Sequence, residues 1–150
     1  MLLTSRNCEQ YILCCMDKLQ KAIDLTNQGE FEKAKIVFEE ILQENPDNVD
    51  VLYNFGLYFI KIREPTHAIV VLSRFLSLEA QRVSTYIALG DAFLLLDDPK
   101  EAKKHLITAL NIEVDNPYAL RKLGVAYGKL GELANSAFCL KKAYKINPEN

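Results

Sequence analysis

The chain has 150 residues, of which 49% are hydrophobic, a length and composition that suit one folded domain. Its 18 Lys and Arg against 20 Asp and Glu give a net charge of −2, so no strong field would draw the chain to nucleic acid or to anionic lipid. Arg6, Asn7 and Glu9 interrupt the N-terminal apolar residues, which excludes a secretory signal or membrane span there, and we expect a cytoplasmic protein.

The first predicted element is a long helix from about Cys8 to Asn27. Asn7, with Gln10 three residues later, resembles a capping box that opens a helix, and residues 1–7 are expected to be frayed. An apolar stripe recurs at steps of three and four residues along this helix. The stripe consists of Tyr11, Cys15, Leu19, Ala22, Ile23 and Thr26. We expect this helix to be longer than the later ones and to cap the N-terminal end of the fold.

A second helix is predicted from about Glu32 to Glu44. Gly29 separates it from the first helix and suits the left-handed conformation beyond a helix C-terminus. Pro65 and Pro99 occupy the corresponding turns of the next two helix pairs, where a proline suits the first turn of a helix. Asp98 is a natural N-cap before the second of them. These two turns are therefore predicted to be built differently from the glycine turn.

Residues of one size recur every 34 positions, which is the signature of a repeat architecture. The columns are Gly56, Gly90 and Gly124; Ala34, Ala68, Ala102 and Ser136; Leu25, Phe59, Phe93 and Tyr127; and Phe38, Leu72, Leu106 and Leu140. A glycine inside a helix costs roughly 1 kcal/mol relative to alanine. Its recurrence predicts a close approach between paired helices, with the alanine column as the small partner.

The pattern resembles the tetratricopeptide repeat, a 34-residue helix-turn-helix unit. Tyr86-x2-Leu89-Gly90-x2-Phe93 corresponds to the family motif W-x2-L-G-x2-Y. The resemblance implies an all-α fold, a right-handed superhelical solenoid of antiparallel helix pairs with about eight helices. The predicted units are an N-terminal extension at 1–14, which includes the start of the first helix, and repeats at 15–48, 49–82, 83–116 and 117–150. In the first repeat, Lys18 and Lys21 replace large apolar residues of the pattern.

No catalytic or metal-binding constellation is evident in the sequence. His67 and His105 fall on second helices, where the family presents its outer surface, and we expect both to be solvated. The four cysteines lack metal-ligand spacing and are predicted to be reduced thiols; they are Cys8, Cys14, Cys15 and Cys139. The sequence therefore predicts a non-catalytic protein with no cofactor and no metal.

The resemblance implies that the first helices line a concave groove, to which five positions of each repeat contribute. These positions are unusually apolar, and a contiguous exposed apolar surface usually marks a binding site. The predicted partner-binding residues are Leu19, Ile23, Tyr53, Leu57, Ile60, Lys61, Ile87, Asp91, Leu94, Tyr118, Arg121 and Val125. Asp91 and Arg121 are expected to pair with charges of the partner. Alternatively, some apolar members such as Leu94 pack against the adjacent helix, or residues 1–7 fill the groove.

The family's best-known ligand mode does not fit this chain. In that mode lysine, asparagine and arginine grip a C-terminal carboxylate of a chaperone, and in either register at most one position, or one plus Lys122 in place of arginine, agrees. A carboxylate among leucines would be uncompensated. We therefore predict a protein–protein interaction scaffold that holds a partner peptide or amphipathic helix. Two alternatives stay open, namely a chaperone for an aggregation-prone client and a regulatory repeat region of a larger enzyme.

The last helix is predicted to carry an apolar edge that a following repeat or a polar cap would normally cover. The edge residues are Leu140, Ala143, Tyr144 and Ile146. Either the sequence is a fragment of a longer array, or this edge self-associates.

Overall fold

The computed structural model describes residues 5–79 and 81–148, and every regular element in these ranges is an α-helix. The predictions for residues 1–4, Ala80 and Asn150 lie outside these ranges. The all-α fold class is confirmed. The helices are α1 (Ser5–Gln28), α2 (Phe31–Glu44), α3 (Val49–Lys61), α4 (Pro65–Leu78), α5 (Val83–Leu95), α6 (Pro99–Ile112), α7 (Pro117–Lys129) and α8 (Leu133–Ile146).

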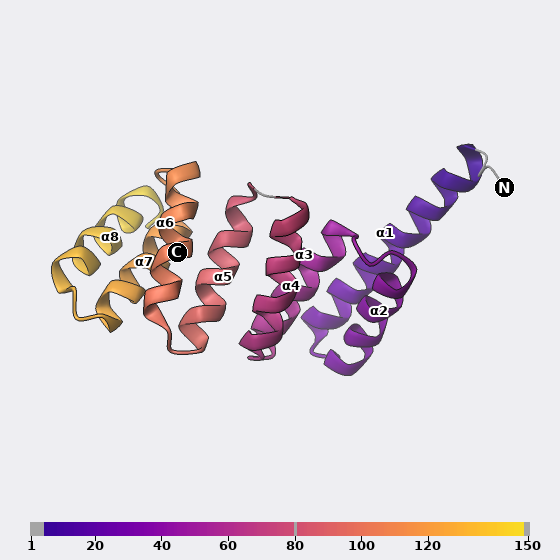
Figure 1. Ribbon diagram of the computed structural model, residues 1–150, viewed down its shortest axis with the longest axis horizontal. Coiled ribbons are helices and arrows are strands. Elements are labelled where there is room, and N and C mark those ends of the chain that lie inside the picture. Colours follow the sequence, from indigo (N-terminus) through magenta and orange to yellow (C-terminus); the bar gives the residue numbers. More distant parts are fainter. Residues whose placement is uncertain (1–4, 80, 149–150) are drawn as a thin grey trace.

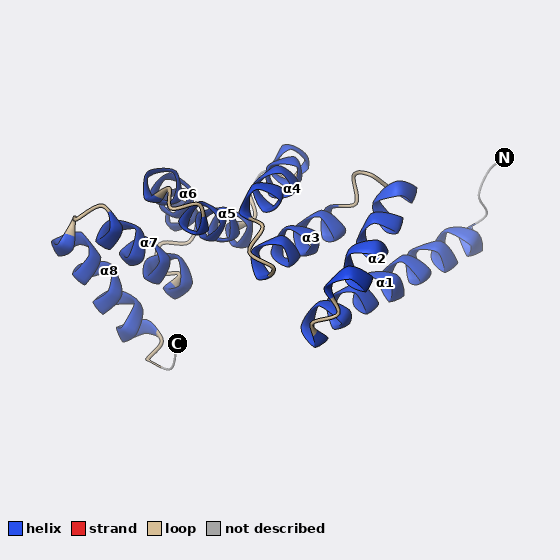
Figure 2. Cartoon of the chain, turned by 90° about the horizontal axis from the view of Figure 1, so that it is seen from below, coloured by secondary structure: helices blue, strands red, loops and turns tan. Residues whose placement is uncertain are grey.

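The helices form four consecutive antiparallel pairs, and the pairs stack into a helical-repeat solenoid (Figures 1 and 2). Within each pair a short turn joins two helices that pack along their length. The first helices of adjacent pairs, α3 with α5 and α5 with α7, also contact each other, so they line one continuous surface. The N-terminal part of α1 projects beyond α2, because α1 has 24 residues and α2 has 14 (Figure 1).

Helix α1 begins earlier than the sequence predicts. It starts at Ser5 rather than at about Cys8, so Asn7 lies inside the helix and the predicted capping box at Asn7 is wrong. The physical reason is that residues 5–7 contain no Pro or Gly to stop the helix from extending. The second helix, α2, agrees with the prediction within one residue, since it runs from Phe31 to Glu44.

The turn inside each helix pair contains one residue in the left-handed conformation, always at the same repeat position. The φ angles are 82° for Gly29, 62° for Arg63, 58° for Asp97 and 76° for Gly131. The prediction of a differently built turn at the two prolines is therefore wrong for the backbone, because the same geometry is kept with Arg63 and Asp97. The left-handed conformation costs a non-glycine residue roughly 1–2 kcal/mol.

The predicted start signals of the later helices are confirmed. Pro65 and Pro99 stand in the first turns of α4 and α6. The side chain of Asp98 accepts a hydrogen bond from the backbone N–H of Glu101 at 3.1 Å, as expected of an N-cap. These signals fix where each second helix begins relative to the first.

The three glycines that recur every 34 residues, Gly56, Gly90 and Gly124, each lie against a leucine of the paired second helix. A Cβ at Gly90 would lie 2.6 Å from Cγ of Leu106, and Gly56 has the same relation to Leu72. The predicted close approach is confirmed, but its partner is the leucine column rather than the alanine column. Leu72 and Leu106 are fully buried, so these contacts belong to the core.

The core consists of three clusters of buried residues that follow one another along the stack, with partly buried side chains between them. Aromatic residues dominate the first two repeats, where the rings of Phe38 and Phe55 stack at 5.0 Å between centroids. A small cluster at the middle joins Leu72 of α4 to Ala88 and Leu89 of α5, and it connects the two halves. Each repeat is thus buried mainly against its neighbours, as expected for a solenoid.

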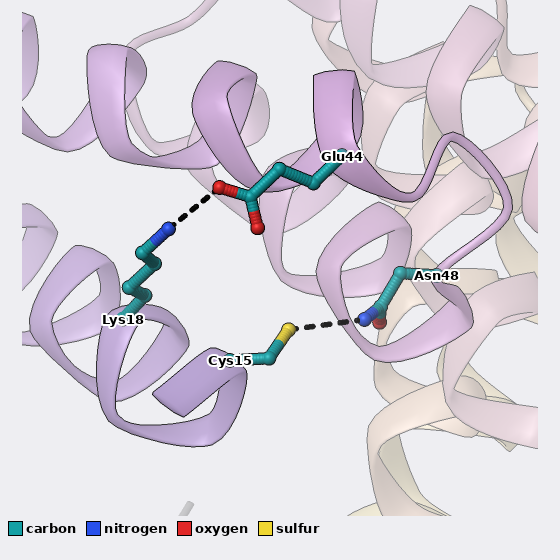
Figure 3. Close-up of polar contacts among 4 residues, drawn as sticks. All are labelled: Cys15, Lys18, Glu44 and Asn48. Atoms are coloured by element: carbon teal, nitrogen blue, oxygen red, sulfur yellow. Dashed lines mark hydrogen bonds and ion pairs between the residues drawn. The ribbon is translucent and has the colours of Figure 1, made fainter. Parts of the chain in front are cut away.

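The N-terminal repeat compensates for its departures from the repeat pattern with polar contacts. Nζ of Lys18 lies 2.7 Å from Oε1 of Glu44, and Nδ2 of Asn48 lies 3.5 Å from Sγ of Cys15 (Figure 3). Lys18 occupies the position held by Leu120 in the fourth repeat. These contacts hold the partly polar end of the stack against α2 and the start of α3.

Candidate functional site

The first helices and the ends of the helices beside them line three adjoining cavities, of about 600, 410 and 130 Å³. The first two share Asp91 and Lys122 in their walls, and the third shares Leu57 with the first and Lys61 with the second. We call this continuous surface the first-helix groove. It extends from the C-terminal part of α1 across α3 and α5 to α7.

The structure brings together all but one of the residues that the sequence predicts to bind a partner. The groove is lined by Ile23, Tyr53, Leu57, Ile60, Lys61, Ile87, Asp91, Leu94, Tyr118, Arg121 and Val125. Leu19 lines none of the three cavities and packs against the core of the first two repeats. Ile60 and Leu94 line the groove and also pack against core residues.

The groove exposes apolar side chains from three successive first helices. Leu57 of α3 is 37% exposed, and Val125 and Tyr118 of α7 are 42% and 47% exposed. Ile87 of α5 is half-buried between them in the wall of the largest cavity. The chain thus leaves this apolar surface open to solvent, where a partner could cover it.

The charged residues of the groove are partly paired within the chain. Oδ1 of Asp91 lies 2.7 Å from Nζ of Lys122, so Asp91 already has an ion-pair partner within the chain. Its pairing with a charge of the bound partner stays a prediction. The guanidinium carbon of Arg121 lies 5.9 Å from the ring centre of Tyr118. Among the described residues, Arg121 has no carboxylate within ion-pair distance.

Sequence reasoning missed Arg82, which joins two parts of the groove wall. Its guanidinium lies over the ring of Tyr53 at 4.7 Å and near that of Phe75 at 5.6 Å. It also lies 3.9 Å from Oδ1 of Asp50. Arg82 immediately precedes α5. Only its place in the sequence could have indicated this role. Arg82 is the last residue of the second repeat, and a residue that joins two repeats lies beside the first helix of the next one.

The two histidines differ in environment, and the surface prediction is wrong for His105. Its ring stacks on Phe93 with 5.2 Å between centroids and an 8° angle between planes. Burial lowers the pKa of His105, so the neutral imidazole is favoured. His67 is 65% exposed and lies beside Glu64, in agreement with the prediction. The ring of His67 also stacks, on Phe59 with 5.1 Å between centroids, so partial burial rather than stacking distinguishes His105.

The cysteines and acidic groups give no sign of a reactive centre in the described part of the chain. Cys14, Cys15 and Cys139 are free thiols there, and burial raises the pKa of the Cys139 thiol. No cluster of three metal-ligating side chains occurs among residues that the structure describes. None of the described helices is long and apolar enough to cross a membrane.

Stacked antiparallel helix pairs with a 34-residue period and a groove along the first helices define a helical-repeat solenoid protein. Two family models, both described as tetratricopeptide repeat, match residues 83–116 and 117–150. The predicted resemblance to the tetratricopeptide-repeat family is confirmed, and the matches cover residues 83–150.

Solved structures of MamA have a similar fold. One is 27% identical to this chain with a TM-score of 0.77, and the match covers 83% of this chain and 73% of MamA. MamA 41-end from Desulfovibrio magneticus RS-1 is 19% identical with a TM-score of 0.82, over 91% of this chain and 77% of that one. A comparison with curated protein sequences found no match. The tetratricopeptide repeats support a role in protein–protein interaction, and the MamA structures support the fold.

Proposed function

We propose that this protein is a non-catalytic scaffold that holds a peptide or an amphipathic helix of a partner protein in the first-helix groove. The proposal is carried by the solvent-exposed apolar surface that Leu57, Ile87 and Val125 form on three successive first helices. Repeats of this kind are typically non-catalytic. A partner segment with apolar residues at helical or alternating spacing would cover this surface and gain the hydrophobic contribution of the burial.

The double variant Leu57→Asp, Ile87→Asp is expected to lose the partner, because two carboxylates would be buried against its apolar side chains. The measurement is affinity capture from lysate of the source cells with tagged wild type and variant, followed by quantification of each captured protein. Circular dichroism and a thermal melt first establish that the variant folds. A specific scaffold should lose one partner by at least tenfold.

The matched control is Ile36→Asp, Val70→Asp, which makes the same kind of change at exposed residues of the second helices α2 and α4. This variant should capture the partner as well as wild type does. Equal losses in both double variants would count against the groove. Loss of many apolar proteins rather than one from the groove variant would favour the chaperone alternative.

The C-terminal edge supports a second, separate proposal of self-association. Leu140 is 41% exposed, whereas Leu72 and Leu106 at the same repeat position are fully buried. Tyr144 is also exposed, but Ala143 is buried and does not belong to the edge. Ile146 is as exposed as Ile112, its counterpart in the third repeat, although a further helix pair follows Ile112. This exposure is therefore normal for the repeat position, and Ile146 is not counted as an edge residue. The edge therefore consists of Leu140 and Tyr144.

We propose that two copies meet through this edge around a two-fold axis. Head-to-tail stacking is disfavoured because the opposite end presents Lys18 and Lys21 where an inner first helix presents apolar residues. In sedimentation velocity, wild type should shift from monomer to dimer as concentration rises, and Tyr144→Asp should stay monomeric. Val70→Asp, on the outer helix α4, should dimerise like wild type. A wild type that is monomeric at every concentration would exclude the edge contact.

A further inference from the structure

The walls of the first-helix groove carry an excess of positive charge, although the whole chain has a net charge of −2. The charged residues in the walls of the three cavities are Lys61, Arg63, Arg82, Arg121 and Lys122 on the basic side and Asp91 and Glu113 on the acidic side. From this imbalance we infer that the segment bound in the groove is acidic as well as apolar. The inference rests on the proposed groove function and adds the charge of the partner.

Internal ion pairs account for only part of this excess. Asp91 pairs with Lys122, and Asp50, which lies outside the cavity walls, approaches Arg82. Glu113 accepts a hydrogen bond from Asn116 and makes no ion pair with a described cation. Three cations then remain without a carboxylate partner among the residues that the structure describes. They are Lys61, Arg63 and Arg121.

These three cations are distributed on both sides of the apolar surface. Lys61 and Arg63, at the C-terminal end of α3, line the same cavity as Leu94 and Val125. Arg121 of α7 lines the cavity that contains Leu57 and Ile87. A bound segment would thus place apolar side chains between cations, and carboxylates that flank those side chains would face them. Arginine pairs well with carboxylates because its planar fork can donate two hydrogen bonds.

Arg63 gives a second, independent reason. It occupies the left-handed turn position that is glycine in the first and fourth repeats, and its φ of 62° is unfavourable for a side chain. Its side chain is exposed and lines the groove. The fold requires this conformation in every turn, but it does not require an arginine there, so the side chain at this strained position is a reason to look for function. A cation that contacts a partner carboxylate is such a function.

The test is selection of a phage-displayed library of random 16-residue peptides on the full-length protein. Binders that also bind the Leu57→Asp, Ile87→Asp variant are removed, so the retained peptides depend on the groove. We expect the ratio of Asp and Glu to Lys and Arg in the retained peptides to be at least twice the ratio in the unselected library. A retained set with no charge bias, or a basic one, would overturn the acidic preference while leaving the groove function in place. If every selected peptide also binds the Leu57→Asp, Ile87→Asp variant and none is retained, the proposed function itself fails.

The most enriched peptide then serves as the probe for the individual cations. Its affinity is measured by fluorescence anisotropy at low and high salt. The triple variant Lys61→Gln, Arg63→Gln, Arg121→Gln should bind at least tenfold more weakly at low salt, and the difference should shrink as salt screens the charges. The control is Lys33→Gln, Lys104→Gln, Lys141→Gln, which removes three charges from second helices and should leave the affinity within twofold. Equal weakening of peptide binding in both triple variants would mean that only the net charge of the protein matters. That result would contradict a specific role of the three groove cations.

Discussion

Replacing Phe75 by alanine is expected to lower the free energy of unfolding by about 3–5 kcal/mol, which is the usual range for a buried phenylalanine. Phe75 of α4 is fully buried, and its ring lies 5.9 Å from that of Tyr53 and 5.6 Å from the guanidinium carbon of Arg82. The change removes apolar contact and leaves a cavity under the groove wall. Urea titration followed by far-UV circular dichroism measures the loss.

The control for this change is Phe138→Ala, the same substitution at a phenylalanine of α8 that is 68% exposed. It should alter the free energy of unfolding by less than about 0.5 kcal/mol. Because repeat arrays can unfold in parts, hydrogen exchange should locate the loss of protection in α3 to α5 rather than in α7 and α8. If both variants lose a similar amount of unfolding free energy, burial does not determine how much Phe75 contributes to stability.

The period of 34 residues was sufficient to predict the fold, because in a solenoid each repeat packs against its neighbours in the same way. Phe38, Leu72 and Leu106 share a repeat position, and all three are buried. The same reasoning located most of the groove, since repeat position determines which side of a first helix faces solvent. It failed for Leu19, which lies in the terminal repeat, where the pattern of contacts is no longer complete.

The sequence was less informative at positions where a residue departs from its usual conformational or burial preference, or where two repeats make a specific contact. Arg63 adopts the backbone conformation of glycine, which no propensity scale would predict. Thr85 of α5 is fully buried, and its hydroxyl has no hydrogen-bond partner among the described residues, at a repeat position where Val51 and Ala119 are buried. The ion pair between Asp91 and Lys122 joins two repeats across 31 positions, so only the three-dimensional stacking of helices reveals it.

A single methyl group added at Gly90 is expected to destabilise the stack by about 1–3 kcal/mol, although alanine is the better helix former. The new Cβ would lie 2.6 Å from Cγ and 2.8 Å from Cδ2 of Leu106, closer than carbon atoms approach each other. Leu106 is fully buried and cannot rotate away without displacing its neighbours. The midpoint of urea unfolding in Gly90→Ala should therefore fall relative to wild type.

Gly128→Ala, the same substitution in helix α7, should have the opposite sign. A Cβ at Gly128 would lie 3.5 Å from Oγ of Ser136, an ordinary van der Waals contact, and the position is exposed. Without a clash, alanine should stabilise the helix by about 0.5–1 kcal/mol, because glycine loses more backbone entropy on folding. Opposite shifts in the two variants would establish that the close approach between α5 and α6 requires glycine at position 90. A stabilised Gly90→Ala would instead mean that Leu106 yields and that the recurring glycine has another cause.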